Sequence, residues 1–190
     1  MSNEKKLIAI SAPSGTGKTS IIQEILKLNQ NKLIFSISAT TREKRLNEID
    51  GVDYFFLTRE EFEHKIQNDK FIEWEEIYGD YYGTLKSEIE RAKKLNKHIL
   101  FELDVNGSLK LKKLYPQTIT IFIAPPSIEE LENRLKTRKT ETSESLHKRI
   151  ERAKIEMEKA KLFDFLVMND NLNNAISEVN QIIQKTIEDC

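Results

Sequence analysis

The sequence predicts an α/β fold, with a parallel β-sheet flanked by helices, an inserted β-rich lobe and a short helical lid. Short apolar runs alternate with amphipathic stretches along most of the chain, which is typical of a parallel sheet. A glycine-rich turn at residues 13–17 joins the first apolar run to the first amphipathic stretch, as in a βαβ unit. Between residue 38 and about residue 84 the alternation is interrupted by strand-like runs around a short helix, which predicts the inserted lobe.

Short runs rich in apolar and β-branched residues are expected to be strands. In chain order they are residues 7–10, 33–37, 52–57, 70–77, 98–103, 118–124 and 163–168. The first run is wholly apolar, which is typical of a central strand buried on both faces. Pro125 and Pro126 end the 118–124 run, because proline has no N–H to donate to a neighbouring strand.

Helices are expected where apolar residues recur every three or four positions, and we interpret these stripes as core contacts. In chain order the stretches are residues 21–28, 58–68, 87–96, 107–114, 127–135, 146–160 and 172–187. Thr58, Ser87 and Ser127 each precede a glutamate by three positions, which is the spacing of a capping box at a helix start.

One domain is expected, because the chain has no internal repeat, low-complexity tract or proline- or serine-rich linker. From residue 137 onward the lid segment is polar and lacks large apolar side chains, as a mobile segment would. Within this single domain of residues 1–190 we assign the core to residues 1–37, 85–133 and 146–190, the lobe to residues 38–84 and the lid to residues 134–145.

Composition excludes several classes of protein. The 190 residues carry 30 Lys plus Arg against 31 Asp plus Glu, and a net charge of −1 argues against a nucleic-acid coat or a polybasic membrane binder. No apolar run approaches the roughly 20 residues that span a bilayer, and the first residues show no signal-peptide pattern. A lone cysteine, Cys190, fits a reducing compartment, and the three histidines show no metal-site spacing. We therefore expect a cytoplasmic protein.

Residues 12–19 match the P-loop pattern G-x-x-x-x-G-K-[ST] at every fixed position except the first, where Ala12 replaces glycine. Such a loop points several backbone N–H groups at a phosphate, and the following helix adds the positive end of its dipole. Lys18 can reach the β- and γ-phosphates, and the Thr19 hydroxyl can ligate Mg²⁺. An alanine at position 12 requires a negative φ. The alternative interpretation is a tight βα turn that happens to contain Lys-Thr.

The motif and its context predict a P-loop NTPase core, and the whole loop with the next residue is assigned to ATP. The residues expected to bind ATP are Ala12, Pro13, Ser14, Gly15, Thr16, Gly17, Lys18, Thr19 and Ser20.

A second phosphate site is indicated after the second strand. Arg42 and Arg45 lie three residues apart, hydroxyl residues precede them and Tyr54 follows, which suits a phosphate monoester because arginine is a forked, permanent donor. Judged on spacing alone, a solvated charged loop is equally compatible. The guanine-reading N-K-x-D pattern of GTPases is absent, since Asn169 and Asp170 lack its lysine.

Several further motifs occur in a fixed order, and together with the P-loop they closely resemble the guanylate kinase family of nucleoside monophosphate kinases. The resemblance runs from about residue 7 to residue 170, and its motifs are residues 38–45, 51–54, 71–74, 81–84, 104–107 and 134–138.

The resemblance implies roles for individual residues. Those implied to bind GMP are Ser38, Arg42, Arg45, Tyr54, Glu73, Tyr82, Thr84 and Asp104. Those implied to act on the transferring phosphoryl are Lys18, Arg42, Arg134, Arg138 and Arg149. The implied reaction transfers the γ-phosphoryl of ATP to GMP, and also to dGMP, with Mg²⁺, in purine nucleotide metabolism.

Chemistry supports this reading of the base site. Guanine presents N1–H and a 2-amino group side by side, and a carboxylate such as Glu73 accepts from both, whereas adenine has an acceptor at N1. A Thr84 hydroxyl can donate to O6 of the base. Without the resemblance, Glu73 would rather be interpreted as a surface carboxylate in an acidic run.

No general base is needed, because a phosphate monoester with a second pKa of ~6 is largely ionised at neutral pH.

Two alternatives remain: a catalytically inactive guanylate-kinase-like module that binds proteins, and a kinase for another small acceptor. The expected partners are ATP and GMP, with no nucleic-acid polymer and no membrane, and a monomer or a homo-oligomer is equally compatible. Glu102 is compatible with a place near Mg²⁺ through water or with a structural role.

Overall fold

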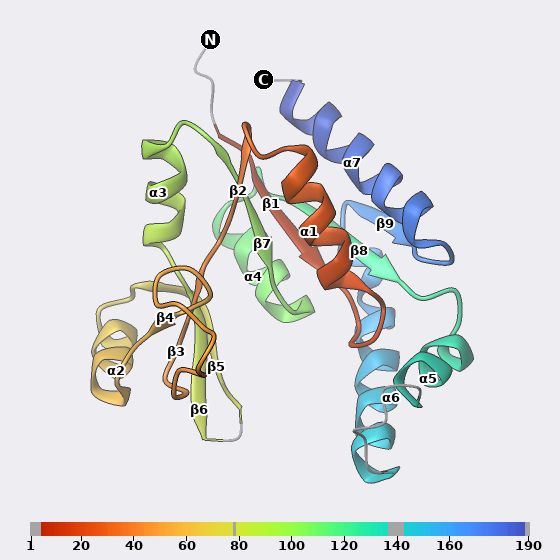
Figure 1. The fold of residues 1–190 in the computed structure, drawn as a ribbon, viewed down its shortest axis with the longest axis horizontal. Helices are drawn as coiled ribbons and strands as arrows, with labels where there is room; N and C mark the ends of the chain where they lie inside the picture. The colour runs from red at the N-terminus through yellow and green to blue at the C-terminus, as the bar shows by residue number, and fades with distance from the viewer. Residues whose placement is uncertain (1–4, 78, 137–142, 189–190) are drawn as a thin grey trace.

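The computed structural model describes residues 5–77, 79–136 and 143–188 (Figure 1). Five strands form a wholly parallel sheet in the order β2-β7-β1-β8-β9. Their bounds are Leu7–Ser11 for β1, Leu33–Phe35 for β2, His98–Glu102 for β7, Ile119–Ala124 for β8 and Phe165–Met168 for β9. The prediction of a parallel-sheet α/β core is confirmed.

Both faces of β1 are covered by helices, and every residue of this strand is buried. Ile8 and Ile10 pack with α1 (Lys18–Leu28) and α7 (Leu172–Glu188) on one face. Leu7 and Ala9 point to the other face, where α3 (Ser87–Lys94) and α4 (Val105–Leu114) lie. The continuous apolar run therefore marks a central strand, as the sequence predicted.

A second sheet has the order β4-β3-β6-β5, and its bounds are Ser38–Thr40 for β3, Phe55–Phe56 for β4, Phe71–Ile77 for β5 and Asp80–Leu85 for β6. Helix α2 (Arg59–Gln67) packs on it through Phe62, whose ring stacks on Phe71 at 4.3 Å between centroids. Helix α2 begins with the complete capping box of Thr58 and Glu61 that the sequence predicted.

The remaining helices are α5 (Ile128–Lys136), α6 (Ser143–Glu158) and the short η1 (Ala160–Leu162). Helices α5 and α6 pack together through Leu131, Leu135 and Ala153. In Figure 1 they lie on one side of the loop that follows β1, and the second sheet lies on the other side. Among the residues described, no helix is long and apolar enough to cross a membrane.

Some boundaries differ from the sequence-based expectations. The 33–37 run is a strand only to Phe35, and within the 52–57 run only Phe55 and Phe56 are in a strand. The cap expected at Ser87 is wrong, because α3 is capped by Lys86 without a side-chain bond. The carboxylate of Glu88 in its first turn accepts from the Ile37 N–H, so this side chain binds a distant backbone donor and does not cap its own helix.

Candidate nucleotide-binding site

The P-loop connects the end of β1 to the first turn of α1. Gly17 precedes α1 with a φ of 90°, and a Cβ there would lie 2.8 Å from the Asn169 side-chain nitrogen, so only glycine fits. Ala12 has a negative φ as predicted, since Asp69 and Asn96 are the non-glycine residues with positive φ in the described chain. The loop therefore leads directly into the N-terminus of α1, the positive end of the helix dipole, where an anion is favoured.

Asn169 ties this loop to the strand at the sheet edge. The side-chain Nδ2 of Asn169 donates to the Thr16 backbone carbonyl at 2.6 Å, and the backbone carbonyl of Asn169 accepts from Arg134 Nη1 at 3.2 Å. These residues line a cleft of about 420 Å³ with Ser20 and Leu172. The structure thus brings the predicted residue Arg134 to the mouth of the P-loop.

Lys18 lies at the carboxyl end of the parallel sheet. Its Nζ is 3.3 Å from Glu102 Oε1 at the end of β7, and its side chain is 20% exposed. The amine therefore remains accessible to a phosphate. The exposed Thr19 follows it in the first turn of α1. Oxygen donors such as this hydroxyl and the nearby Glu102 carboxylate suit Mg²⁺, which usually binds few protein ligands together with substrate phosphates.

Three predicted base-binding residues form a row across neighbouring strands of the second sheet. Thr84 on β6 pairs with Ser38 on one side and with Glu73 on the other. Asp104 caps α4 by accepting from the Gly107 N–H at 2.6 Å. A Cβ at Gly107 would lie only 3.2 Å from Glu73 Cγ, so the missing side chain makes room for this carboxylate.

The environment of Glu73 differs from that of an open surface. Burial raises the pKa of its carboxyl, the Thr84 hydroxyl partly offsets this through a hydrogen bond, and the charge of Asp104 adds to the rise. Glu73 is therefore a desolvated acceptor beside a hydroxyl group. This arrangement can recognise two adjacent N–H donors of a planar base.

The residues expected to grip a phosphate lie at the other end of the same face. The Arg42 guanidinium is 5.5 Å from the centroid of the Tyr54 ring, and the Tyr54 and Tyr82 rings meet edge to face at 6.4 Å. Tyr82 and Thr84 are two positions apart on β6, so their side chains share a face of the strand. Arg45 is exposed in the loop that follows Arg42.

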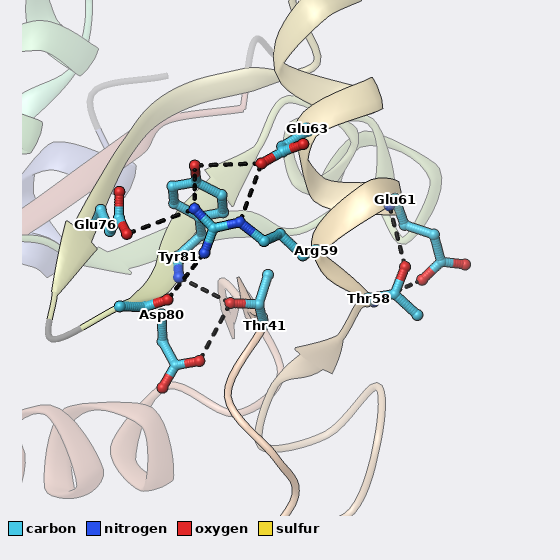
Figure 2. A network of polar contacts seen from close by, with 9 residues as sticks. Thr41, Thr58, Arg59, Glu61, Glu63, Glu76, Asp80 and Tyr81 are labelled. Carbon is cyan, nitrogen blue, oxygen red and sulfur yellow. Dashed lines mark hydrogen bonds and ion pairs between the residues drawn. The ribbon is translucent and has the colours of Figure 1, made fainter.

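A polar network that includes Thr41, Arg59 and Tyr81 fixes the backbone next to Arg42 and Tyr82 (Figure 2). The Thr41 hydroxyl accepts from the Tyr81 N–H at 2.8 Å, and the Thr41 N–H donates to the Tyr81 carbonyl at 3.0 Å. Arg59 of α2 lies over the Tyr81 ring at 4.4 Å and donates to its hydroxyl at 2.8 Å. Helix α2 thus holds in place the two backbone segments that carry Arg42 and Tyr82, the side chains expected to bind a phosphate.

Other predicted residues are placed less fully. Arg149 is half-buried on α6, and Arg138 lies outside the described residues, as does residue 137 and the rest of the lid up to residue 142. Sequence reasoning missed Asn169 as an anchor of the P-loop, since its partner is 153 residues away. It also missed Glu48, which pairs with Arg42 at 2.8 Å, although a carboxylate so near two arginines was a visible signal.

A parallel sheet whose first strand leads through a glycine-rich loop into a helix beginning with lysine defines a P-loop nucleotide-binding protein. The family model described as guanylate kinase matches residues 4–186 of this chain. The chain belongs to the guanylate kinase family.

Individual relatives agree with this membership. The guanylate kinase of Mesomycoplasma hyopneumoniae strain 7448 is 48% identical over 190 residues, covering 96% of each chain. That of Carboxydothermus hydrogenoformans is 45% identical over 177 residues, covering 93% of this chain and 86% of the relative. The crystal structure of guanylate kinase from Anaplasma phagocytophilum matches with a TM-score of 0.74 and 26% identity, covering 97% of this chain and 87% of that one.

Proposed function

We propose that this chain is a guanylate kinase, which transfers the γ-phosphoryl of ATP to GMP, and also to dGMP, giving ADP and the nucleoside diphosphate. One observation carries this proposal: the two candidate sites meet at the end of β7. Glu102, the last residue of β7, contacts Lys18 of the P-loop, and Asp104, two residues later, caps α4 beside Glu73. A donor nucleotide on the P-loop and a base at Glu73 would therefore flank the same strand end.

The residues divide into two groups by substrate. In this proposal ATP is bound by Ala12, Pro13, Ser14, Gly15, Thr16, Gly17, Lys18, Thr19 and Ser20. GMP is bound by Ser38, Arg42, Arg45, Tyr54, Glu73, Tyr82, Thr84 and Asp104. Charge on the transferring phosphoryl is neutralised by Lys18, Arg42, Arg134, Arg138 and Arg149.

Positioning and electrostatics suffice for this reaction. A GMP phosphate oxygen, largely ionised at neutral pH because its second pKa is ~6, attacks the γ-phosphorus while the bond to the ADP oxygen breaks. Lys18 and the arginines hold donor and acceptor in line and stabilise the spread charge. Mg²⁺, when bound with ATP, would neutralise charge on the β- and γ-phosphates, and the Thr19 hydroxyl would hold it.

The proposal extends to organisation and setting. Residues 38–84 would act as the GMP-binding lobe and residues 134–145 as a lid that closes over ATP and excludes water. The protein would work in the cytoplasm on small-molecule substrates. An inactive protein-binding module is not favoured, because the chain retains Lys18, Thr19 and Arg42.

A coupled assay of ADP release tests this function. We expect turnover with ATP and GMP or dGMP, and at least a hundredfold lower kcat/KM with AMP, CMP or UMP, since a base site that leaves a buried acceptor unpaired rejects analogues by up to ~10⁴-fold. Turnover with AMP equal to that with GMP would contradict the assignment of the base site.

A further inference from the structure

Glu48 holds one edge of the Arg42 side chain. Arg42 Nη1 donates to Glu48 Oε2 at 3.1 Å, and Nη2 donates to Oε1 at 2.8 Å. The two side chains are only 18% and 17% exposed, so this is a sheltered, bidentate pair. Arg42 Nη1 also donates to the Glu43 carbonyl oxygen at 2.7 Å. None of the roles assigned above uses Glu48.

Glu48 and the Glu43 carbonyl leave the second edge of Arg42 to other acceptors, and the Tyr82 hydroxyl, which is also expected to bind the GMP phosphate, hydrogen-bonds the same guanidinium. A guanidinium has five N–H groups in two forks, and the bonds to Glu48 and to the Glu43 carbonyl use both N–H groups of Nη1 and one of Nη2. The fork of Nε–H and the second Nη2–H is used by neither glutamate. Tyr54 and Phe56 lie at 5.5 and 5.8 Å from the guanidinium carbon and limit its rotation.

The same carboxylate also fixes the backbone at the second arginine. The Arg45 N–H donates to Glu48 Oε2 at 2.8 Å, so one side chain closes the loop between the two arginines. This loop lacks regular secondary structure between β3 and β4, and its conformation therefore depends on such contacts. Bonds from Arg42 and the Arg45 N–H lower the pKa of Glu48, which keeps the carboxylate charged.

We propose that Glu48 is a positioning residue for the acceptor phosphate. It binds the Nη1 and Nη2 fork of Arg42 and the Arg45 N–H, so that the fork of Nε–H and the second Nη2–H faces the phosphate monoester. This proposal rests on the proposed function. A carboxylate near a phosphate site repels the phosphate, and its bonds to Arg42 and to the Arg45 N–H offset that cost. Because the fork it occupies differs from the one it leaves open, Glu48 does not compete with the phosphate.

The experiment compares Glu48→Gln and Glu48→Asp with wild type, and uses Glu43→Gln as the matched control. The control removes an equal charge from an exposed side chain of the same loop and keeps the carbonyl that Arg42 uses. We would measure kcat, the KM for GMP and for ATP, and the inhibition constant of guanosine, which has the base without the phosphate.

In Glu48→Gln we expect the KM for GMP to rise ~10- to 100-fold, because a misplaced binding group can cost about 10²-fold. The KM for ATP and the inhibition constant of guanosine should stay within about twofold, and Glu48→Asp should restore part of the loss. Glu43→Gln should behave as wild type.

Three results would overturn the role of Glu48 while wild type remains active: tighter GMP binding in Glu48→Gln, which would make it a competitor; an equal loss for guanosine, which would indicate damage to the lobe; or no change. Wild-type protein that does not phosphorylate GMP would instead overturn the proposed function and this proposal with it.

Discussion

Lys18 and Glu73 use charge in opposite ways. Lys18 keeps contact with solvent and pairs with the Glu102 carboxylate at 3.3 Å, so its ammonium group can exchange this partner for an incoming phosphate. Glu73 is desolvated, and burial raises its pKa, so the fold holds a costly acceptor in place. Such a cost is expected at a recognition site, where residues serve binding rather than stability.

Lys18→Ala should lower kcat by about 10²-fold or more, because it removes a preorganised donor to the transferring phosphoryl. The melting temperature should change by a few degrees at most, since partly exposed ion pairs contribute about 1 kcal/mol or less. Lys27→Ala, which breaks an exposed pair with Glu24 on the same helix, is the matched control and should leave kcat unchanged. Steady-state kinetics and thermal unfolding provide the measurements, and a near-normal kcat in Lys18→Ala would contradict the P-loop assignment.

Glu73→Gln should reduce the preference for GMP over AMP by about tenfold or more, because an amide cannot accept from both guanine donors. In wild type the KM for GMP should rise as pH falls through the raised pKa of Glu73, where protonation removes an acceptor. Protonation of the GMP phosphate, whose second pKa is ~6, also changes GMP binding, so the Glu73→Gln profile serves as the control for that second effect. Identical pH profiles for the two proteins would show that Glu73 does not read the base.

At the scale of elements, local features were predictable and long-range contacts were not. The buried run of β1 and the capping box at Thr58 depend on neighbouring residues, and both are confirmed. Ser87 has the same cap spacing, yet it does not cap α3, and the neighbouring Glu88 binds the N–H of Ile37 between β2 and β3, which no spacing rule foresees. The alignment of Ser38 with Thr84 depends on the register of strands that lie far apart in the sequence.

The same limit applies to the candidate site. The P-loop could be predicted in full because its chemistry lies within eight consecutive residues, 12–19. The tether from Asn169 joins two elements at opposite ends of the chain, and only the fold brings them together. The nearness of Glu48 to Arg42 in sequence signals a candidate pair, but an irregular loop has no period that fixes which acidic residue makes the contact.

Asn169→Ala should loosen the P-loop and raise the KM for ATP several-fold, with less effect on the KM for GMP. Asn169 is 4% exposed, and its loss leaves the buried Thr16 carbonyl without its donor, which costs about 1–3 kcal/mol. Asn174→Ala, an exposed position on α7, is the control. Kinetics and urea unfolding measure both effects, and an unchanged KM for ATP would remove Asn169 from the loop's support.

Over the whole molecule, arginine is reserved for places that need a forked, permanent cation. The chain has 22 Lys but only eight Arg, and five of the eight are proposed to contact phosphates. The other three also act as forks: Arg59 lies on Tyr81, Arg91 binds Glu88 and the Phe35 carbonyl, and Arg152 joins Asp104 to Glu156. If the proposed function holds, the near-zero net charge coexists with a concentrated positive site.

Acid should destabilise the whole fold through a histidine far from the site. His98 is 5% exposed at the start of β7, and its Nδ1 accepts from the Lys6 N–H at 3.0 Å, which requires the neutral ring. Burial, with the charges of Lys5, Lys6 and Lys32, lowers its pKa below the ordinary 6.5. As pH falls below 6.5 the unfolded chain therefore binds a proton that the folded chain does not, and stability decreases.

Thermal unfolding from pH 8 to pH 5 measures this effect. The melting temperature of wild type should be steady above about pH 7 and should fall as the unfolded-state histidine titrates. The free energy of unfolding should decrease by up to about 1.4 kcal/mol for each pH unit through which only the unfolded state is protonated. His98→Asn should flatten the profile in that window, although it lowers stability at every pH. His64→Asn, at an exposed position on α2, controls for the loss of a histidine and should keep the wild-type slope. If His98→Asn and His64→Asn show equal slopes, the acid sensitivity arises elsewhere in the molecule.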